Sequence, residues 1–285
     1  LIRAVIAQRN YKSAEEIVEI EKACDVTADM HITAMKVLRP GMYEYEVVAE
    51  MNRVAESNNC QLSFATIATI NGQTLHNHYH GNKVKPGDLF LIDAGAEVES
   101  GYAGDMSSTI PDKKFTARQR EVYEIQNAMH LESVKALRPG IPYMEVYELS
   151  ARVMVDGMKA LGLMKGNTED AVREGAHALF YPHGLGHMMG LDVHDMENLG
   201  EIWVGYNGQP KSTQFGRKSQ RLAIPLEPGF VHTVEPGIYF IPELIDMWKG
   251  EKKFTDFINY DVVETYKDFG GIRNEEDYLI TETGA

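Results

Sequence analysis

The sequence MHITAMKVLRPG at residues 30–41 returns as MHLESVKALRPG at residues 129–140, an offset of 99 positions. Together with the Glu-Val pair that follows each copy, nine residues are identical in register. Self-similarity at a fixed offset is the signature of a duplicated structural unit. We therefore predict one domain over the whole chain, residues 1–285, built from two similar halves at about 1–115 and 116–285.

Each copy predicts an amphipathic helix that ends at Arg-Pro-Gly, followed by a second helix at about 44–58 or 143–161. Strand-like stretches follow each helix pair, at 63–70, 88–94 and 101–110 in the first half and at 178–182, 228–234 and 272–280 in the second. The polar stretches 201–221 and 243–268 have the character of irregular insertions in the second half. The pattern predicts an α+β fold in which two helices followed by strands occur twice.

Two acids in each half occupy matching positions. Asp93 and Glu235 each lie seven residues after the proline of a Pro-Gly pair, and Asp105 and Glu275 each lie four residues after a glycine. A pseudo-two-fold arrangement would bring all four to one cleft, where they would repel one another unless cations bind. Two divalent ions would balance the charge. Oxygen-rich ligation favours manganese, and cobalt or zinc become suitable once an imidazole joins.

The imidazole is predicted in the stretch HGLGHMMGLDVH at residues 183–194. Its glycines disfavour a helix, so it is not the helical zinc-protease motif, and in an extended chain His183 and His187 share one face. In the second cluster, HNHYH at 76–80, we expect at least two of the three histidines to lie in a solvated loop. Four other histidines are expected to have no part in the site: His31, His130, His177 and His232.

Composition excludes several classes of function. Lys and Arg number 28 against 42 Asp and Glu, a net charge of −14, and no basic run suggests nucleic-acid binding. No apolar run is long enough to span a bilayer. Cys24 and Cys60 make no disulfide framework, so we expect a cytoplasmic location. The opening Leu-Ile-Arg, in place of Met, suggests a fragment or a processed product.

Five strings, in order along nearly the whole chain, are shared with a known family: Asp93-Ala94-Gly95, Gly104-Asp105, His183-Gly184-Leu185-Gly186-His187 with His194, Glu235-Pro236-Gly237, and Arg273-Asn274-Glu275-Glu276-Asp277. They resemble the pita-bread metallopeptidases that cleave Xaa-Pro bonds, which include prolidase and aminopeptidase P. The resemblance implies a pita-bread fold, a curved antiparallel sheet flanked by the two helix pairs. From the resemblance we expect the N-terminal domain usual in the family, which often contributes to dimerisation, to be absent from this chain. A homodimer is a further expectation.

The resemblance implies a set of ligands for two metal ions: Asp93, Asp105, His187, Glu235 and Glu275. Asp105 and Glu275 would bridge the ions. The other implied site residues are Glu235 as proton shuttle, His194 as a donor to the developing oxyanion, His76 and His183 around the leaving proline, and Arg273 and Tyr239 supporting the ligands. Where Asn274 sits, the family usually has an apolar residue.

The resemblance leaves the substrate open between two enzymes. Residues 238–246 and 269–273 resemble the prolidase branch, and Arg221 falls where prolidases bind the carboxylate of an Xaa-Pro dipeptide, a bidentate match to that group. An aminopeptidase P would instead release the first residue of longer peptides with proline at the second position. Methionine aminopeptidase lacks the long stretch after Glu235. A catalytically silent binding module, or a metal-free creatinase-like hydrolase, would be expected to lose ligands that this chain keeps.

Overall fold

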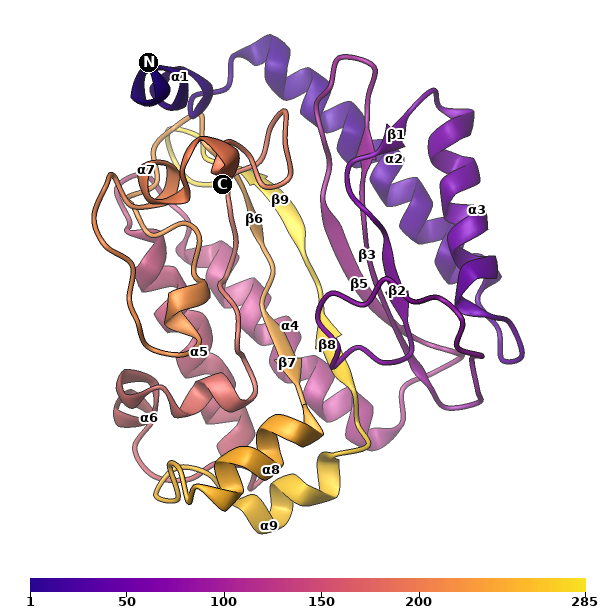
Figure 1. Ribbon diagram of the computed structural model, residues 1–285, viewed down its shortest axis with the longest axis vertical. Coiled ribbons are helices and arrows are strands. Elements are labelled where there is room, and N and C mark those ends of the chain that lie inside the picture. The colour runs from indigo at the N-terminus through magenta and orange to yellow at the C-terminus, as the bar shows by residue number, and fades with distance from the viewer.

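The structure, a computed structural model, describes all residues 1–285 (Figure 1). The α-helices are α1 Ile2–Arg9, α2 Ala14–Val37, α3 Glu44–Ser57, α4 Ala117–Ala136, α5 Tyr143–Ala160, α6 Thr168–Glu174, α7 Glu201–Gly205, α8 Pro242–Gly250 and α9 Tyr260–Val263. Short 3-10 helices are η1 Ala176–Leu179, η2 Glu197–Leu199, η3 Arg217–Ser219 and η4 Glu264–Tyr266. The strands are β1 Gln61–Leu62, β2 Ile67–Thr69, β3 Leu89–Ala94, β4 Ala96–Glu97, β5 Met106–Pro111, β6 Val231–Val234, β7 Gly237–Tyr239, β8 Gly271–Arg273 and β9 Glu276–Leu279.

The first long helix of each half begins in the same way. At α2, Ser13 Oγ accepts the Glu16 amide while the Ser13 amide donates to the Glu16 carboxylate, and Thr116 and Gln119 repeat this capping box at α4. Each box satisfies two backbone donors that a helix start leaves unpaired and stabilises the helix by about 1 kcal/mol. The duplication therefore extends to the side chains that start the helices.

The same two helices also end alike. α2 stops before the Arg-Pro-Gly that ends at Gly41, and α4 stops before the copy that ends at Gly140. Proline cannot continue the helix, and the glycines turn with φ of 98° and 84°, a left-handed conformation that favours glycine. Each turn sends the chain into the second helix of its pair, α3 or α5.

All strand pairs are antiparallel. β2, β3 and β5 form a three-stranded sheet, while β6 pairs with β9, β7 with β8 and β1 with β4. Figure 1 shows α2 and α3 beside the strands of the first half, and α4 and α5 beside those of the second. The first pair packs on a core that includes Met30, Val47 and Phe90, and the second on a larger core that includes Met129 and Val146. The strands of both halves meet where Ser107 bridges Glu275.

The two histidines of the repeat, His31 and His130, form hydrogen bonds between their helices and the adjacent strands. His31 in α2 bonds Ser108 Oγ at 3.0 Å and the Ala94 carbonyl at 3.2 Å, and His130 in α4 bonds the Tyr278 hydroxyl at 2.9 Å. Both imidazoles are buried. They pack behind the strands, and neither lines the site described below, as expected from the sequence.

Three sequence predictions of local structure were wrong. Residues 178–182 form the end of η1 and irregular chain, where a strand was predicted. The stretches 201–221 and 243–268, predicted to be irregular, contain α7 and most of α8 with α9. α8 forms because Pro242 opens its first turn, and its Ile245 and Trp248, three residues apart, are buried together in the core. No helix in the structure has the length and apolar character needed to cross a membrane.

Candidate metal centre

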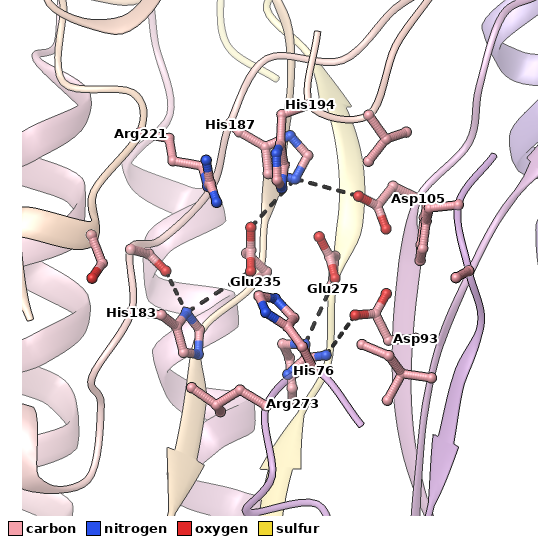
Figure 2. Close-up of a pocket in the computed structure, with 18 of the residues that line it drawn as sticks. His76, Asp93, Asp105, His183, His187, His194, Arg221, Glu235, Arg273 and Glu275 are labelled. Atoms are coloured by element: carbon pink, nitrogen blue, oxygen red, sulfur yellow. Dashed lines mark hydrogen bonds and ion pairs between the residues drawn. The ribbon is translucent and has the colours of Figure 1, made fainter. Parts of the chain in front are cut away.

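A cavity of about 510 Å³ lies between the strands of the two halves. Figure 2 shows ten labelled side chains around it, and these are nearly all the residues predicted for the site: His76, Asp93, Asp105, His183, His187, His194, Arg221, Glu235, Arg273 and Glu275. Tyr239 is the exception, because its fully buried ring lies behind the cavity wall. The structure thus brings together residues that span two hundred positions of sequence.

The four carboxylates come from matching places in the strands. Asp93 lies in β3 and Asp105 immediately precedes β5, while Glu235 separates β6 from β7 and Glu275 separates β8 from β9. In Figure 2 their carboxylates face a common space. The shared cleft predicted from the duplicated spacing is present.

His187, in the second half of the chain, lies beside these carboxylates. Its Nε2 atom lies 3.3 Å from Asp105 Oδ2 and 3.5 Å from Glu235 Oε1. Its Nδ1 atom donates to the Met188 carbonyl at 3.0 Å, and this bond orients Nε2 towards the carboxylates. An imidazole oriented in this way by a backbone carbonyl is typical of a metal ligand.

The buried charge at this point is suited to cations. Potential ligand atoms of Asp105, His187 and Glu275 all lie within 4.8 Å of one another. Burial, and then the neighbouring carboxylates, raise the pKa of Asp105 and of Glu275 well above the ordinary range. Asp105 Oδ1 is buried and has no hydrogen-bond partner. Negative charge crowded in this way and an unpaired acceptor fit a bound divalent ion.

Arg273 is the cation that already faces the acids. Its side chain is 5% exposed, and its Nη2 atom donates to Asp93 Oδ2 at 2.6 Å. Its Nη1 atom donates to the Tyr239 hydroxyl at 2.9 Å, which in turn donates to His183 Nε2 at 2.8 Å. Tyr239 therefore couples Arg273 to His183 from behind the cavity. Burial, and then the charge of Arg273, lower the pKa of His183 to about 3, so this imidazole is neutral.

Two histidines of the 76–80 cluster line the cavity, His76 and His78. His80 is turned away and bonds the Thr66 carbonyl at 3.0 Å. All three lie in a loop, and His76 and His78 are exposed, so the expectation that at least two of the three would lie in a solvated loop is confirmed, although His76 and His78 also line the cavity. Burial, and then the charge of Arg273, lower the pKa of His76.

Three residues that support the acids were missed in the sequence. Ser107 Oγ donates to Glu275 Oε2 at 2.6 Å, Thr233 Oγ1 donates to Glu235 Oε1 at 3.3 Å, and Asp277 Oδ2 accepts the Asp105 amide at 3.0 Å. Each lies in a strand, two residues from one of the four acids at the strand's end, and Ser107 and Asp277 bond the acid of the other half. That spacing was the signal that could have found them.

A fourth missed residue is Glu197, which follows the stretch at 183–194. Its carboxylate Oε2 accepts from His194 Nδ1 at 3.2 Å and from Arg221 Nη1 at 2.5 Å. Burial opposes its ionisation, but the hydrogen bond from His194 and the positive charges nearby outweigh burial and lower its pKa. No repeat or strand pattern marks this position.

Solved structures share this fold. Proline aminopeptidase P II from Yersinia pestis matches 99% of the chain at 37% identity with a TM-score of 0.81, and aminopeptidase PepP from Pseudomonas aeruginosa matches 100% at 31% with a TM-score of 0.80. Each match covers 57% of the solved chain. The predicted pita-bread fold is thereby confirmed, and a pita-bread fold around an acidic cavity with grouped metal-compatible side chains defines a metallopeptidase scaffold.

Residues 18–282 match the model of metallopeptidase family M24, and the chain belongs to this family. Among curated relatives, the Xaa-Pro aminopeptidase of Escherichia coli K12 is 39% identical over 97% of the chain, and the human Xaa-Pro dipeptidase is 31% identical over 98%. These matches cover 55% and 57% of the two relatives, so the chain spans a little over half the length of the curated relatives it matches.

Proposed function

We propose that this chain is the catalytic domain of a metallopeptidase that hydrolyses the peptide bond before proline, with its two halves forming one domain. One observation carries the proposal: five metal-compatible side chains converge on one cavity in which negative charge exceeds positive charge. The proposed ligands are Asp93, Asp105, His187, Glu235 and Glu275. The family and the named relatives support the activity, since both relatives carry Xaa-Pro in their names.

Two divalent ions would be held by this ligand set, in which Asp105, His187 and Glu275 already group their ligand atoms. Four carboxylates and one imidazole favour manganese, and also accommodate cobalt or zinc. A zinc-substituted form of the aminopeptidase P of E. coli has been solved, and that chain is 37% identical to this one. When bound, such ions polarise a carbonyl group and lower the pKa of water.

The chain's own residues would then move the proton and stabilise charge. Burial raises the pKa of Glu235, so this carboxylate is suited to take a proton and to return it to the proline nitrogen. Thr233 orients it through the hydrogen bond to Oε1. With its Nδ1 atom donating to Glu197, His194 would need a second proton, on Nε2, to donate to the oxyanion that forms when the carbonyl is attacked. His76 and the neutral His183 would hold the proline ring, which has no N–H to offer.

An Xaa-Pro dipeptide is the first substrate we propose, because Arg221 reaches the cavity from the second half (Figure 2). A guanidinium there can bind the carboxylate of a dipeptide that ends at proline. Release of the first residue from longer Xaa-Pro peptides is the second candidate. The Arg221–Glu197 ion pair favours it, since Arg221 already has an anionic partner. The E. coli aminopeptidase P solved with the inhibitor Pro-Leu is also similar to this chain.

Hydrolysis of Gly-Pro beside Gly-Pro-Gly tests the proposal, with manganese-loaded protein and a metal-stripped control. Cleavage of the dipeptide alone supports the dipeptidase and a role for Arg221 in binding its carboxylate. Efficient cleavage of the tripeptide supports the aminopeptidase. If the manganese-loaded chain cleaves neither peptide, the proposed activity is wrong for this chain.

A further inference from the structure

Glu197 does not itself line the cavity, but it contacts two residues that do, His194 and Arg221, and it is not one of the residues predicted for catalysis. Its side chain is 18% exposed, and its Oε2 atom bonds both His194 and Arg221. Its Oε1 atom is buried and has no partner. The carboxylate is therefore held between two site residues and keeps one acceptor free.

The backbone holds Glu197 in this place. Met196, immediately before it, is fully buried with a φ of 61°, a left-handed conformation that is uncommon outside glycine. Asp195 is 1% exposed, and its carboxylate accepts from Arg9 at 2.6 Å and from Lys12 at 3.0 Å. Two cations from the N-terminal segment thus anchor the turn that presents Glu197. Backbone strain that the surrounding structure sustains is characteristic of functional positions.

The charges of Arg221 and Glu197 affect which substrate group can bind here, a free carboxylate on the proline or a further amide bond. Arg221 carries one positive charge, and Glu197 carries one negative charge in direct contact with it. A substrate carboxylate that approaches Arg221 must therefore compete with the Glu197 carboxylate for the same guanidinium. A peptide that continues beyond proline presents a neutral amide at this point and does not depend on a free guanidinium.

We propose that Glu197 is a specificity-determining residue that occupies Arg221 and disfavours substrates with a free carboxylate on the proline. This inference rests on the proposed function and, within it, favours the second candidate, release of the first residue from longer Xaa-Pro peptides. Glu197 acts through Arg221 on the carboxylate and does not touch the scissile bond. Its contact with His194 survives replacement by glutamine, because the amide oxygen can still accept from the imidazole.

The test compares Gly-Pro with Gly-Pro-amide, which differ only in the carboxylate. In Glu197→Gln, the ratio of kcat/KM for Gly-Pro to that for the amide should rise about tenfold, because Arg221 loses its anionic partner and becomes free to bind the substrate carboxylate. The change should lie in KM for Gly-Pro, with kcat altered less than about twofold. A structural defect would instead lower kcat for both substrates.

Glu201→Gln is the matched control. Glu201 lies four residues further along the same segment and pairs with Lys211, and neither residue lines the cavity. Its substitution should leave the substrate ratio unchanged. Because Glu197→Gln also removes an ion pair, Arg221→Gln and the double variant complete a double-mutant cycle: once Arg221 is gone, Glu197→Gln should no longer raise the ratio.

The outcomes separate the two proposals. A wild-type chain that cleaves neither substrate when manganese is bound contradicts the proposed function and this inference with it. A wild-type chain that is active, with a ratio unchanged in Glu197→Gln, overturns the inference alone. A rise in the ratio that persists in the Arg221→Gln background also overturns it, because the effect would not pass through Arg221.

Discussion

Ser107 and Glu275 join the strands of the two halves through reciprocal backbone hydrogen bonds, with N to O distances of 3.3 and 3.0 Å. The Ser107 hydroxyl also donates to the Glu275 carboxylate and accepts from Arg273 Nε at 2.9 Å. One side chain thus fixes both a proposed metal ligand and the cation beside it, at the junction that forms the cavity.

Ser107→Ala should weaken metal binding about tenfold, because a proposed ligand loses the hydrogen bond that orients it. Titration of the metal-stripped protein with Mn²⁺ measures the affinity. Ser108→Ala is the control: the Ser108 hydroxyl bonds His31 behind the strands, so its loss should leave the affinity within about twofold of wild type. Equal weakening in both variants would argue against a specific role for Ser107.

Asp105→Asn should stabilise the metal-stripped protein while removing the stabilisation that metal provides. The buried Asp105 carboxylate repels its neighbours when no cation is present, so a neutral amide should raise the free energy of unfolding by about 1–3 kcal/mol. Denaturant unfolding with and without Mn²⁺ measures both effects. If Asp105→Asn were destabilised without metal and still gained wild-type stability from Mn²⁺, the proposed ligand role would be wrong. Asp105→Ala and Glu275→Ala should both abolish turnover.

The duplicated motif and its acid spacings were sufficient to predict a two-half α+β arrangement and the shared cavity, whereas the pita-bread fold came from the family resemblance. The residues that begin and end the repeated helices act on their immediate neighbours, so the sequence alone predicts these helix boundaries. The predicted strand at 178–182 failed because buried apolar residues there pack as a 3-10 turn, and periodicity over so short a run does not separate the two. α8 was missed because its few apolar residues lie within a polar stretch.

The site was predictable where residues are repeated or alternate, and not elsewhere. Asp93, Asp105, Glu235 and Glu275 follow from the repeat. Glu197 does not, since its position depends on the turn at Met196 and on anchors more than 180 residues away in the sequence. Asn274 stands where the family usually has an apolar residue. Both ends of its side-chain amide are satisfied: its oxygen accepts from the Thr109 amide, and its nitrogen donates to Gln126.

His177 should make stability fall in mild acid. It is fully buried, and burial with the charge of Arg217 lowers its pKa to about 3, whereas the unfolded chain has a pKa of about 6.5. The unfolded state therefore binds the proton, and the contribution of His177 is complete above pH 6.5 and declines as pH falls towards 3. Between pH 7.5 and 5.5 the loss should be about 1.4 kcal/mol.

Urea unfolding of the wild type and of His177→Gln at these two pH values checks this contribution. The variant should lose about 1.4 kcal/mol less than the wild type over the same interval. Glutamine does not titrate and can still donate to the Tyr147 hydroxyl, which His177 contacts at 3.0 Å. Equal slopes for both proteins would show that His177 is protonated equally in the folded and unfolded states.

Lys12→Met should destabilise the protein by about 3 kcal/mol, because it leaves the buried Asp195 carboxylate with only Arg9 as its cation. Chemical denaturation measures the change. Lys22→Met is the comparison: Lys22 makes an exposed pair with Glu19, so its removal should cost less than about 1 kcal/mol. Similar costs for the two variants would mean that the Lys12–Asp195 pair does not anchor the turn before Glu197.

The most direct test of the account is a titration of the metal-stripped chain with Mn²⁺ in which bound metal and hydrolysis of Gly-Pro and Gly-Pro-Gly are followed together. The account predicts two ions bound per chain, no turnover of either peptide without metal, and turnover of at least one peptide that rises as the sites fill. Turnover that persists after complete removal of metal, or no cleavage of either peptide with both sites filled, would contradict it.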